Sequence, residues 1–159
     1  MRSTIPISKD FREFAELLEK NAVKYLIIGG FAVNFHGYPR YTKDIDIWIM
    51  VENSNIKNLL KSLDQFGFGG LGLTENDFLN EDNIIQLGYE PNRIDLLVSV
   101  EGLDFGSAYN NKIETEIEGI LLNFLSIDDL IEAKKTSARP QDLADADFLI
   151  KLKEKSLKY

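Results

Sequence analysis

Two short apolar runs, each with polar or glycine residues at one end, restrict the fold more than any other feature of the sequence. The run "KYLIIGG" (24–30) is stopped by a glycine pair. The run "DIDIWIMV" (44–51) alternates acidic and apolar residues before it turns fully apolar. Short apolar runs bounded in this way are typical of buried strands. The sequence therefore predicts two core strands whose polar ends lie at an edge or mouth of a sheet.

Helical spacing of apolar residues recurs along the rest of the chain. Ser8 and Ser126 stand where a serine side chain caps the start of a helix, and Pro140 stands where a first helical residue tolerates proline. Gly37 and Gly67 end two of the apolar patterns. The sequence predicts helices over residues 8–23, 31–37, 53–67, 126–138 and 140–155.

Strand patterns fill most of the interval between the third and fourth of these helices. Strands are predicted over 83–89 and 93–100, followed by a hairpin over 112–126 that turns at Glu118-Gly119. This order predicts an α+β (α/β-like) fold, in which helices flank one side of a mixed β-sheet and a C-terminal helical pair follows. We expect one compact domain, with a core over 1–125 and the C-terminal helices 126–159 packed on it.

Composition excludes several classes of protein. The chain of 159 residues carries a net charge of −8, so it gains no general attraction to nucleic acid, which depends on clustered Lys and Arg. It has no cysteine, which excludes disulfides and thiolate metal sites. The N-terminus lacks the apolar region of a signal peptide, and no run approaches the length of a membrane span. We therefore expect a cytoplasmic protein with no membrane partner.

The paired aspartates of the second strand are the first candidate for chemistry. Asp44 and Asp46 are two residues apart on a predicted strand, so their side chains leave the same face. Carboxylates that lie this close repel each other and need a cation or a proton. Asp95 in "RIDLLV" is a single acid on another apolar strand. If the strands are neighbours, the three carboxylates converge into a site that suits Mg²⁺ and two-metal phosphoryl or nucleotidyl transfer.

The glycine pair supplies a partner for such a metal site. Gly29 and Gly30 end a strand and open a short helix, so their backbone N–H groups can approach a phosphate closely. Arg40 and Lys43 flank the aspartates and are candidates to offset phosphate charge. Thr42 either donates a hydrogen bond to a phosphate or fixes the loop before Asp44. These residues together predict a nucleotide site.

In combination, these motifs resemble the polymerase-β-like nucleotidyltransferase superfamily. The resemblance rests on Gly29-Gly30, then Asp44-Ile45-Asp46, then the later acid Asp95. The small size and the form "HGYPRYTKDID" resemble the minimal branch of that superfamily. Within it, the chain is most similar to the nucleotidyltransferases of bacterial abortive-infection type IV toxin–antitoxin systems. The resemblance extends over roughly residues 22–150.

The C-terminal stretch "EAKKTSARPQDLADADFL" is similar to a helical signature of that branch, K…R..D..D. The signature maps to Lys134 (or Lys135), Arg139, Asp142 and Asp145. The resemblance implies that Lys134 and Arg139 contact the nucleotide. The residues themselves leave another interpretation open, in which the two aspartates hold these basic groups by local pairing. A basic, solvated helix end is the third interpretation.

The resemblance also implies a mechanism and a set of ligands. Asp44 and Asp46 would hold Mg²⁺, with two ions expected and Mn²⁺ as the alternative metal. Asp95 would bind the catalytic ion and help to activate the acceptor hydroxyl, while Gly29 and Gly30 would cradle phosphate. The reaction would be attack on the α-phosphorus of a nucleoside triphosphate and release of pyrophosphate. The acceptor would be an RNA or tRNA end, a protein or a small molecule, and a toxin role would add a cognate antitoxin as partner.

Other interpretations compete with this enzyme hypothesis. The chain is alternatively a catalytically inactive nucleotide-binding or partner-binding module with the same fold, or its carboxylates are only structural. The sole histidine, His36, is better explained as a structural side chain than as a metal ligand. The motif "GFGGLG" (67–72) follows a helix rather than a strand, so we interpret it as a flexible loop and not as a dinucleotide fingerprint. Trp48 is expected in the core.

Overall fold

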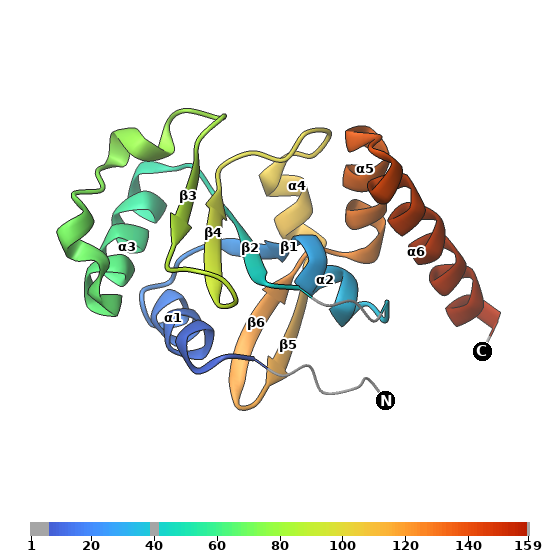
Figure 1. The fold of residues 1–159 in the computed structure, drawn as a ribbon, viewed down its shortest axis with the longest axis horizontal. Helices are drawn as coiled ribbons and strands as arrows, with labels where there is room; N and C mark the ends of the chain where they lie inside the picture. The colour runs from blue at the N-terminus through green and yellow to red at the C-terminus, as the bar shows by residue number, and fades with distance from the viewer. Residues whose placement is uncertain (1–6, 39–41, 159) are drawn as a thin grey trace.

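A mixed sheet forms the centre of the molecule (Figure 1). Across residues 7–38 and 42–158, which the computed structural model describes, six strands pair in the order β3-β4-β2-β1-β6-β5. The β2–β4 and β1–β6 pairs are parallel and the other pairs are antiparallel. The α+β architecture with a mixed sheet is therefore confirmed. The strands are β1 (Tyr25–Ile28), β2 (Asp44–Ile49), β3 (Ile84–Leu87), β4 (Arg93–Leu97), β5 (Ile113–Ile117) and β6 (Ile120–Phe124).

The helices begin where the sequence provides caps. Ser8 accepts a hydrogen bond from the backbone N–H of Phe11, and Ser126 accepts one from that of Asp129. Three short helical turns, η1 (Asp64–Phe68), η2 (Gly69–Leu71) and η3 (Glu75–Phe78), follow the third helix. The helices are α1 (Lys9–Lys20), α2 (Gly29–Phe35), α3 (Asn53–Leu63), α4 (Phe105–Asn110), α5 (Ile127–Ser137) and α6 (Pro140–Lys158).

Helix α4 is absent from the sequence prediction, which passes directly from the strand at 93–100 to the hairpin at 112–126. The helix has only 6 residues, too few to show a helical repeat of apolar positions. Its start is set by Asp104, whose side chain accepts a hydrogen bond from the backbone N–H of Ser107. A cap followed by little more than one turn explains why periodicity did not reveal it.

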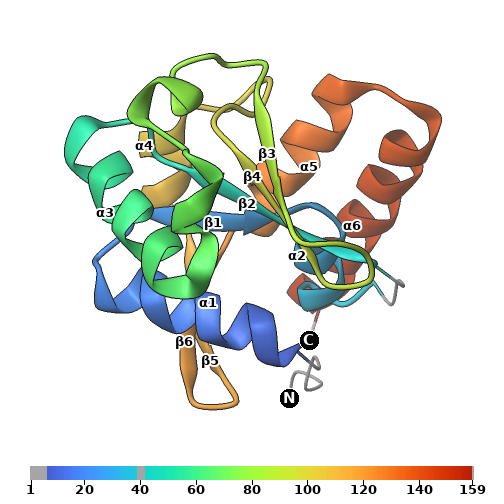
Figure 2. The ribbon, with the colours of Figure 1, turned by 60° about the vertical axis from the view of Figure 1, so that its left-hand side comes forward.

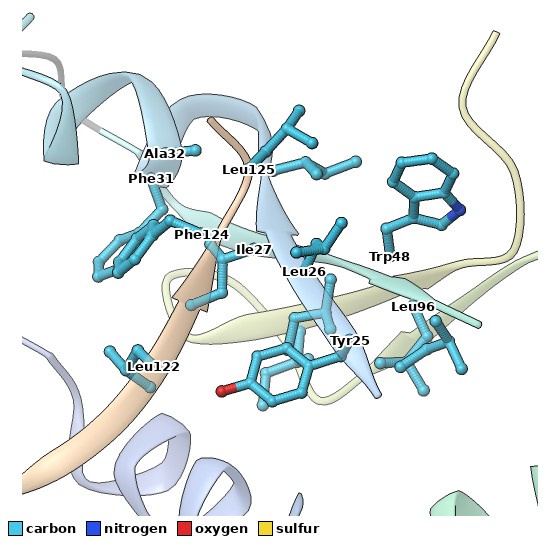
Figure 3. Close-up of a cluster of buried hydrophobic side chains, with 14 of the residues drawn as sticks. Tyr25, Leu26, Ile27, Phe31, Ala32, Trp48, Leu96, Leu122, Phe124 and Leu125 are labelled. Atoms are coloured by element: carbon cyan, nitrogen blue, oxygen red, sulfur yellow. The ribbon is translucent and has the colours of Figure 1, made fainter. Parts of the chain in front are cut away.

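The expectation that helices cover one side of the sheet is wrong, because both faces are covered. Every residue of β1 is buried. On one face, Phe124 stacks on Phe35 with ring centroids 3.9 Å apart, and Phe31 meets Phe11 of α1 edge to face. The close-up of this cluster, with Trp48 across β1, shows how side chains fill both sides (Figure 3).

The opposite face is closed by α4 and by the C-terminal helices. Trp48 is buried and packs edge to face against Phe105 of α4, with ring centroids 5.0 Å apart. Helices α5 and α6 form a hairpin beside α2 (Figure 2). Their buried residues, among them Leu130 and Leu149, belong to the same continuous core as the sheet. The division of the chain at residue 125 remains a prediction.

The topology places the polar ends of three strands together. Strand β1 runs into α2 at Gly29, β2 begins at Asp44, and β4 begins at Arg93. Asp46 lies in register with Ile28 of β1 and with Asp95 of β4. The α5–α6 connection lies near this end of the sheet, because Arg139 and Pro140 line the same cleft as Asp44. Within the described residues, no helix is both long enough and apolar enough to cross a bilayer.

Candidate active site

Strand register brings the three predicted carboxylates to one face of the sheet. Asp46 and Asp95 are direct partners on the parallel strands β2 and β4, and Asp44 precedes Asp46 by two residues. Residues in register on neighbouring strands point to the same side. One carboxylate oxygen from each of Asp44, Asp46 and Asp95 lies within 4.8 Å of the other two. The convergence expected from the sequence is therefore present.

The environment of Asp46 favours a cation or a proton. Burial, with the nearby carboxylates of Asp44 and Asp95, raises the pKa of Asp46 to about 7. A divalent cation among the three carboxylates would remove this penalty. The donor set consists of oxygen only, which is the chemistry that hard ions such as Mg²⁺ prefer. The residues present thus fit a divalent metal.

Arg93 is a site residue that sequence reasoning missed. Its Nη2 lies 2.8 Å from Oδ2 of Asp44 and 3.0 Å from Oδ2 of Asp95, and its Nε lies 2.8 Å from Oδ1 of Asp95. Hydrogen bonding to Asp95 raises the pKa of Arg93, so the guanidinium stays charged. The signal was in the sequence, since Arg93 precedes Asp95 by two residues on a strand and must share its face.

The glycine turn lies directly against the carboxylates. Gly29 has a φ of +69°, and a Cβ added to it would lie 2.2 Å from Oδ2 of Asp46. A Cβ on Gly30 would lie 3.4 Å from Cβ of Thr42. Thr42 donates its hydroxyl to the backbone carbonyl of Asp44, which supports the expectation that Thr42 fixes this loop. The positive φ therefore favours glycine at position 29, and a side chain there would displace the Asp46 carboxylate.

A cleft of about 700 Å³ joins the sheet end to the α5–α6 connection. It is lined by most of the residues that the sequence assigned to nucleotide binding, together with two of the carboxylates. Arg40 lies outside the described residues. The lining consists of Gly29, Gly30, Thr42, Lys43, Asp44, Asp46, Lys134, Arg139, Pro140, Gln141 and Asp142.

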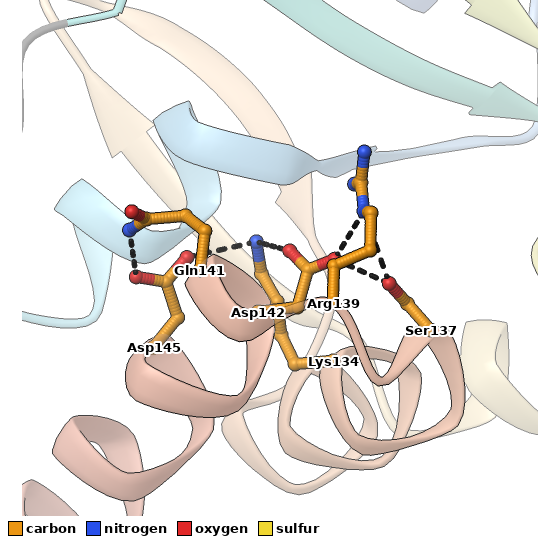
Figure 4. A network of polar contacts seen from close by, with 6 residues as sticks. All are labelled: Lys134, Ser137, Arg139, Gln141, Asp142 and Asp145. Carbon is orange, nitrogen blue, oxygen red and sulfur yellow. Dashed lines mark hydrogen bonds and ion pairs between the residues drawn. The ribbon is translucent and has the colours of Figure 1, made fainter.

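A network of polar contacts holds the C-terminal wall of the cleft (Figure 4). Lys134 Nζ on α5 lies 3.2 Å from Oδ1 of Asp142 and 3.1 Å from Oδ2 of Asp145 on α6. The side chain of Lys134 is 14% exposed and that of Asp145 is fully buried. Gln141 donates to the other oxygen of Asp145 at 3.0 Å. The structure therefore shows local pairing of Lys134, one of the two alternatives to direct nucleotide contact.

Asp142 is the centre of this network. Burial raises its pKa, but hydrogen bonds from Ser137, Arg139 and Lys134 outweigh burial and lower the pKa to about 2. Arg139 uses Nε for this contact, at 2.7 Å from Oδ2 of Asp142. Its side chain is otherwise 78% exposed, and Figure 4 shows the terminal nitrogens pointing away from the network. Arg139 is thus anchored at one nitrogen and presents the rest of its guanidinium.

With this geometry in view, comparison with known proteins gives the family. A family model described as a nucleotidyltransferase of unknown function (DUF6036) matches residues 8–152. The chain belongs to this family. No curated protein matches it. The superfamily resemblance drawn from the Gly-Gly and Asp-x-Asp motifs is confirmed.

Solved structures share the fold of this nucleotidyltransferase family member. An antigenic nucleotidyltransferase-like protein from Paracoccidioides brasiliensis matches with a TM-score of 0.53 and 18% identity, over 93% of this chain and 78% of the other. A nucleotidyltransferase-like protein from Thermotoga maritima matches with a TM-score of 0.58 and 14% identity, over 91% of each chain. A lincosamide antibiotic adenylyltransferase, LnuA, bound to lincomycin, matches with a TM-score of 0.55 and 14% identity, over 93% of this chain and 99% of that one.

Of the remaining sequence candidates, Lys43 belongs to the cleft and the others lie outside the chemistry. His36 Nε2 is 2.7 Å from the backbone carbonyl oxygen of Leu125, as expected for a structural histidine. The "GFGGLG" segment forms parts of η1 and η2 after α3, so no strand precedes it and the dinucleotide interpretation has no support. Lys43 lines the cleft, and its Nζ is 3.9 Å from Oε2 of Glu90. Trp48 is buried in the core, as predicted.

Proposed function

We propose that this nucleotidyltransferase moves a nucleoside monophosphate from a nucleoside triphosphate to a hydroxyl acceptor in a Mg²⁺-dependent reaction. The observation that carries the proposal is the convergence of Asp44, Asp46 and Asp95 beside a glycine turn whose bare backbone lies against Asp46. Such chemistry needs oxygen ligands for the metal and room for a phosphate group beside them. One cleft provides both.

The three carboxylates divide the work at the reacting phosphorus. Asp44, Asp46 and Asp95 would hold the metal, with two ions expected and Mn²⁺ as the alternative. When bound, the metal supplies Lewis-acid stabilisation of charge on the phosphate oxygens. Asp95 orients the acceptor hydroxyl and helps to take its proton. The acceptor oxygen then forms a bond to the α-phosphorus, the bond to the bridging oxygen breaks, and pyrophosphate leaves.

The walls of the cleft position the triphosphate. Gly29 and Gly30 bring bare backbone close to the carboxylates, which suits contact with phosphate oxygens. The guanidinium of Arg139 is held through Nε by Asp142, and its terminal nitrogens are available to donate hydrogen bonds to phosphate. Lys43 adds charge at the rim, and Thr42 holds the loop that presents Asp44. The ammonium of Lys134 already has two carboxylate partners, Asp142 and Asp145. A direct contact between Lys134 and the nucleotide remains a prediction.

The acceptor class stays open between an RNA or tRNA end, a protein and a small molecule. The lincosamide adenylyltransferase, with its small-molecule ligand, supports the last class as a use of this fold. The acidic chain limits an RNA acceptor to the basic groups near Lys134, Lys135, Arg139 and Arg40. We also retain, as proposals, a cytoplasmic location and a role as a toxin held by a cognate antitoxin.

A labelling experiment tests the proposed reaction. The protein is incubated with each of four α-labelled nucleoside triphosphates, Mg²⁺, total RNA and cell lysate, beside an Asp44→Ala/Asp46→Ala control. Label that moves to an acceptor only with the intact aspartates supports the enzyme and names its nucleotide. Mg²⁺-dependent nucleotide binding without transfer points to the inactive binding module. If neither transfer nor nucleotide binding is detected, the carboxylates have only a structural role.

A further inference from the structure

The carboxylates that fit a metal are already engaged by a cation of the chain itself. A single atom, Nη2 of Arg93, bridges Oδ2 of Asp44 at 2.8 Å and Oδ2 of Asp95 at 3.0 Å. Nε of Arg93 occupies the other oxygen of Asp95 at 2.8 Å. Both oxygens of Asp95 and one oxygen of Asp44 thus accept hydrogen bonds from the same guanidinium.

This arrangement competes with a metal ion for the same oxygens. Mg²⁺ binds carboxylate oxygen at roughly 2.0–2.1 Å, which is shorter than any of the contacts of Arg93. An ion that joined the Oδ2 atoms of Asp44 and Asp95 would therefore lie close to Nη2, cation against cation. The guanidinium and the ion repel each other at such a separation, and partial burial weakens the screening by water. The side chain of Arg93 is only 23% exposed.

A second acceptor for Arg93 stands beside the site. Nη1 of Arg93 lies 3.5 Å from Oε1 of Glu90, in the turn between β3 and β4. Glu90 also lies 3.9 Å from Lys43, at the rim of the cleft. The guanidinium is therefore already paired with a carboxylate outside the three aspartates, and it keeps that partner when it leaves Asp44.

We propose that Arg93 is a built-in competitor of the catalytic cation. Without substrate it neutralises Asp44 and Asp95 and opposes the entry of free metal. When the metal enters with the triphosphate, Nη2 of Arg93 leaves the Oδ2 atoms of Asp44 and Asp95, and the guanidinium turns toward Glu90. The site thereby loads metal together with nucleotide rather than alone. This inference rests on the proposed metal-dependent function, because it assigns a cation to the three carboxylates.

Metal binding by the full chain without nucleotide tests the proposal. The affinity for Mn²⁺ is measured by titration calorimetry, with electron paramagnetic resonance of free Mn²⁺ as a second readout. Arg93→Met removes the competing charge, and Arg12→Met is the matched control, since Arg12 pairs with Glu16 on the exposed face of α1. We expect Arg93→Met to bind Mn²⁺ roughly 5- to 150-fold more tightly than wild type, the usual range of coupling between two ligands. Arg12→Met should match wild type.

Two further variants keep the test decisive. Arg93→Lys retains the charge without the fork, so its affinity should lie between those of wild type and Arg93→Met, and it replaces Arg93→Met if that chain does not fold. Glu90→Gln removes the second acceptor and should weaken Mn²⁺ binding. Each variant is first checked for native far-ultraviolet circular dichroism.

The outcomes separate this inference from the proposed function. Tighter binding by Arg93→Met supports the competitor role. Wild-type Mn²⁺ binding that needs Asp44 and Asp46, with equal or weaker binding by Arg93→Met, would overturn the inference and leave the metal-dependent function standing. Absence of Mn²⁺ binding in both wild type and Arg93→Met would overturn the inference, and the labelling experiment, which supplies nucleotide, then tests the proposed function.

Discussion

Replacing Lys134 by methionine removes the ammonium that lies between two carboxylates on α6. Asp142 and Asp145 are both buried, and Lys134 Nζ contacts them at 3.2 and 3.1 Å. Methionine keeps most of the length of the side chain, so the change removes charge rather than packing. The variant therefore asks what the ion pairs between α5 and α6 contribute to the stability of the fold.

The expected magnitude follows from burial. Removing one partner of a buried ion pair costs about 3–5 kcal/mol, because the two buried carboxylates lose the ammonium that offsets their charge. For a chain of this length each kcal/mol lowers the melting temperature by roughly 2–4 °C, so the loss should be roughly 6–20 °C. Arg139→Gln should cost less than about 1 kcal/mol, because its side chain is 78% exposed and such pairs contribute little.

Urea and thermal unfolding followed by circular dichroism at pH 7.5 measure both quantities. Lys135→Met is the matched control, since Lys135 is the exposed neighbour on the same helix. A free energy of unfolding for Lys134→Met within about 1 kcal/mol of wild type would refute the reasoning. Lys134 would then belong to substrate binding, as the family signature implies, and not to the support of the cleft wall.

Three further predictions follow from the same geometry. The pKa of Asp142 is lowered to about 2, so its contribution to stability is fully present above the usual pKa near 4 and is lost as the pH falls through about 2. Asp142→Asn should therefore lose less stability than wild type when the pH falls from 5 to 2. Urea unfolding at a series of pH values measures this difference. Gly29→Ala should destabilise the fold by roughly 1–3 kcal/mol, because its φ is +69° and the new Cβ meets Asp46. It should also abolish the metal binding that calorimetry measures. The control is Gly70→Ala, where a Cβ meets nothing within 4 Å, and this variant should retain metal binding. Arg139→Gln should weaken nucleotide binding at least tenfold in a fluorescence titration while its melting temperature stays close to wild type, and unchanged affinity would remove Arg139 from the phosphate site.

The alternation of charge and apolar residues explains why the site was predictable. Asp44 and Asp46 must share a face on any strand, and the apolar context of Asp95 indicated a neighbouring buried strand. What the sequence did not state was the strand order, and only the parallel β2–β4 pairing places Asp46 beside Asp95. Arg93 follows from the same alternation, but its meaning depends on that pairing.

Other features were beyond reach for physical reasons. Helix α4 is too short to show a repeat. The apolar run of β1 indicated a buried strand, but it does not say which elements cover each face of the sheet. The pairing of Lys134 with Asp145 joins two helices, so its geometry depends on the angle of the α5–α6 hairpin. The spacing in the sequence left open whether Lys134 pairs with the aspartates of α6 or contacts substrate. The distances in the structure show the pairing.

The most direct test of the account is the fate of two labels on one triphosphate. The protein is supplied with Mg²⁺, lysate as a source of acceptor, and nucleoside triphosphate labelled at either the α- or the γ-phosphorus. The account predicts that the α-label becomes attached to an acceptor while the γ-label appears in pyrophosphate, and that both changes require Asp44, Asp46 and Asp95. Transfer of the γ-label to the acceptor, or α-label transfer that survives Asp44→Ala, would contradict the account.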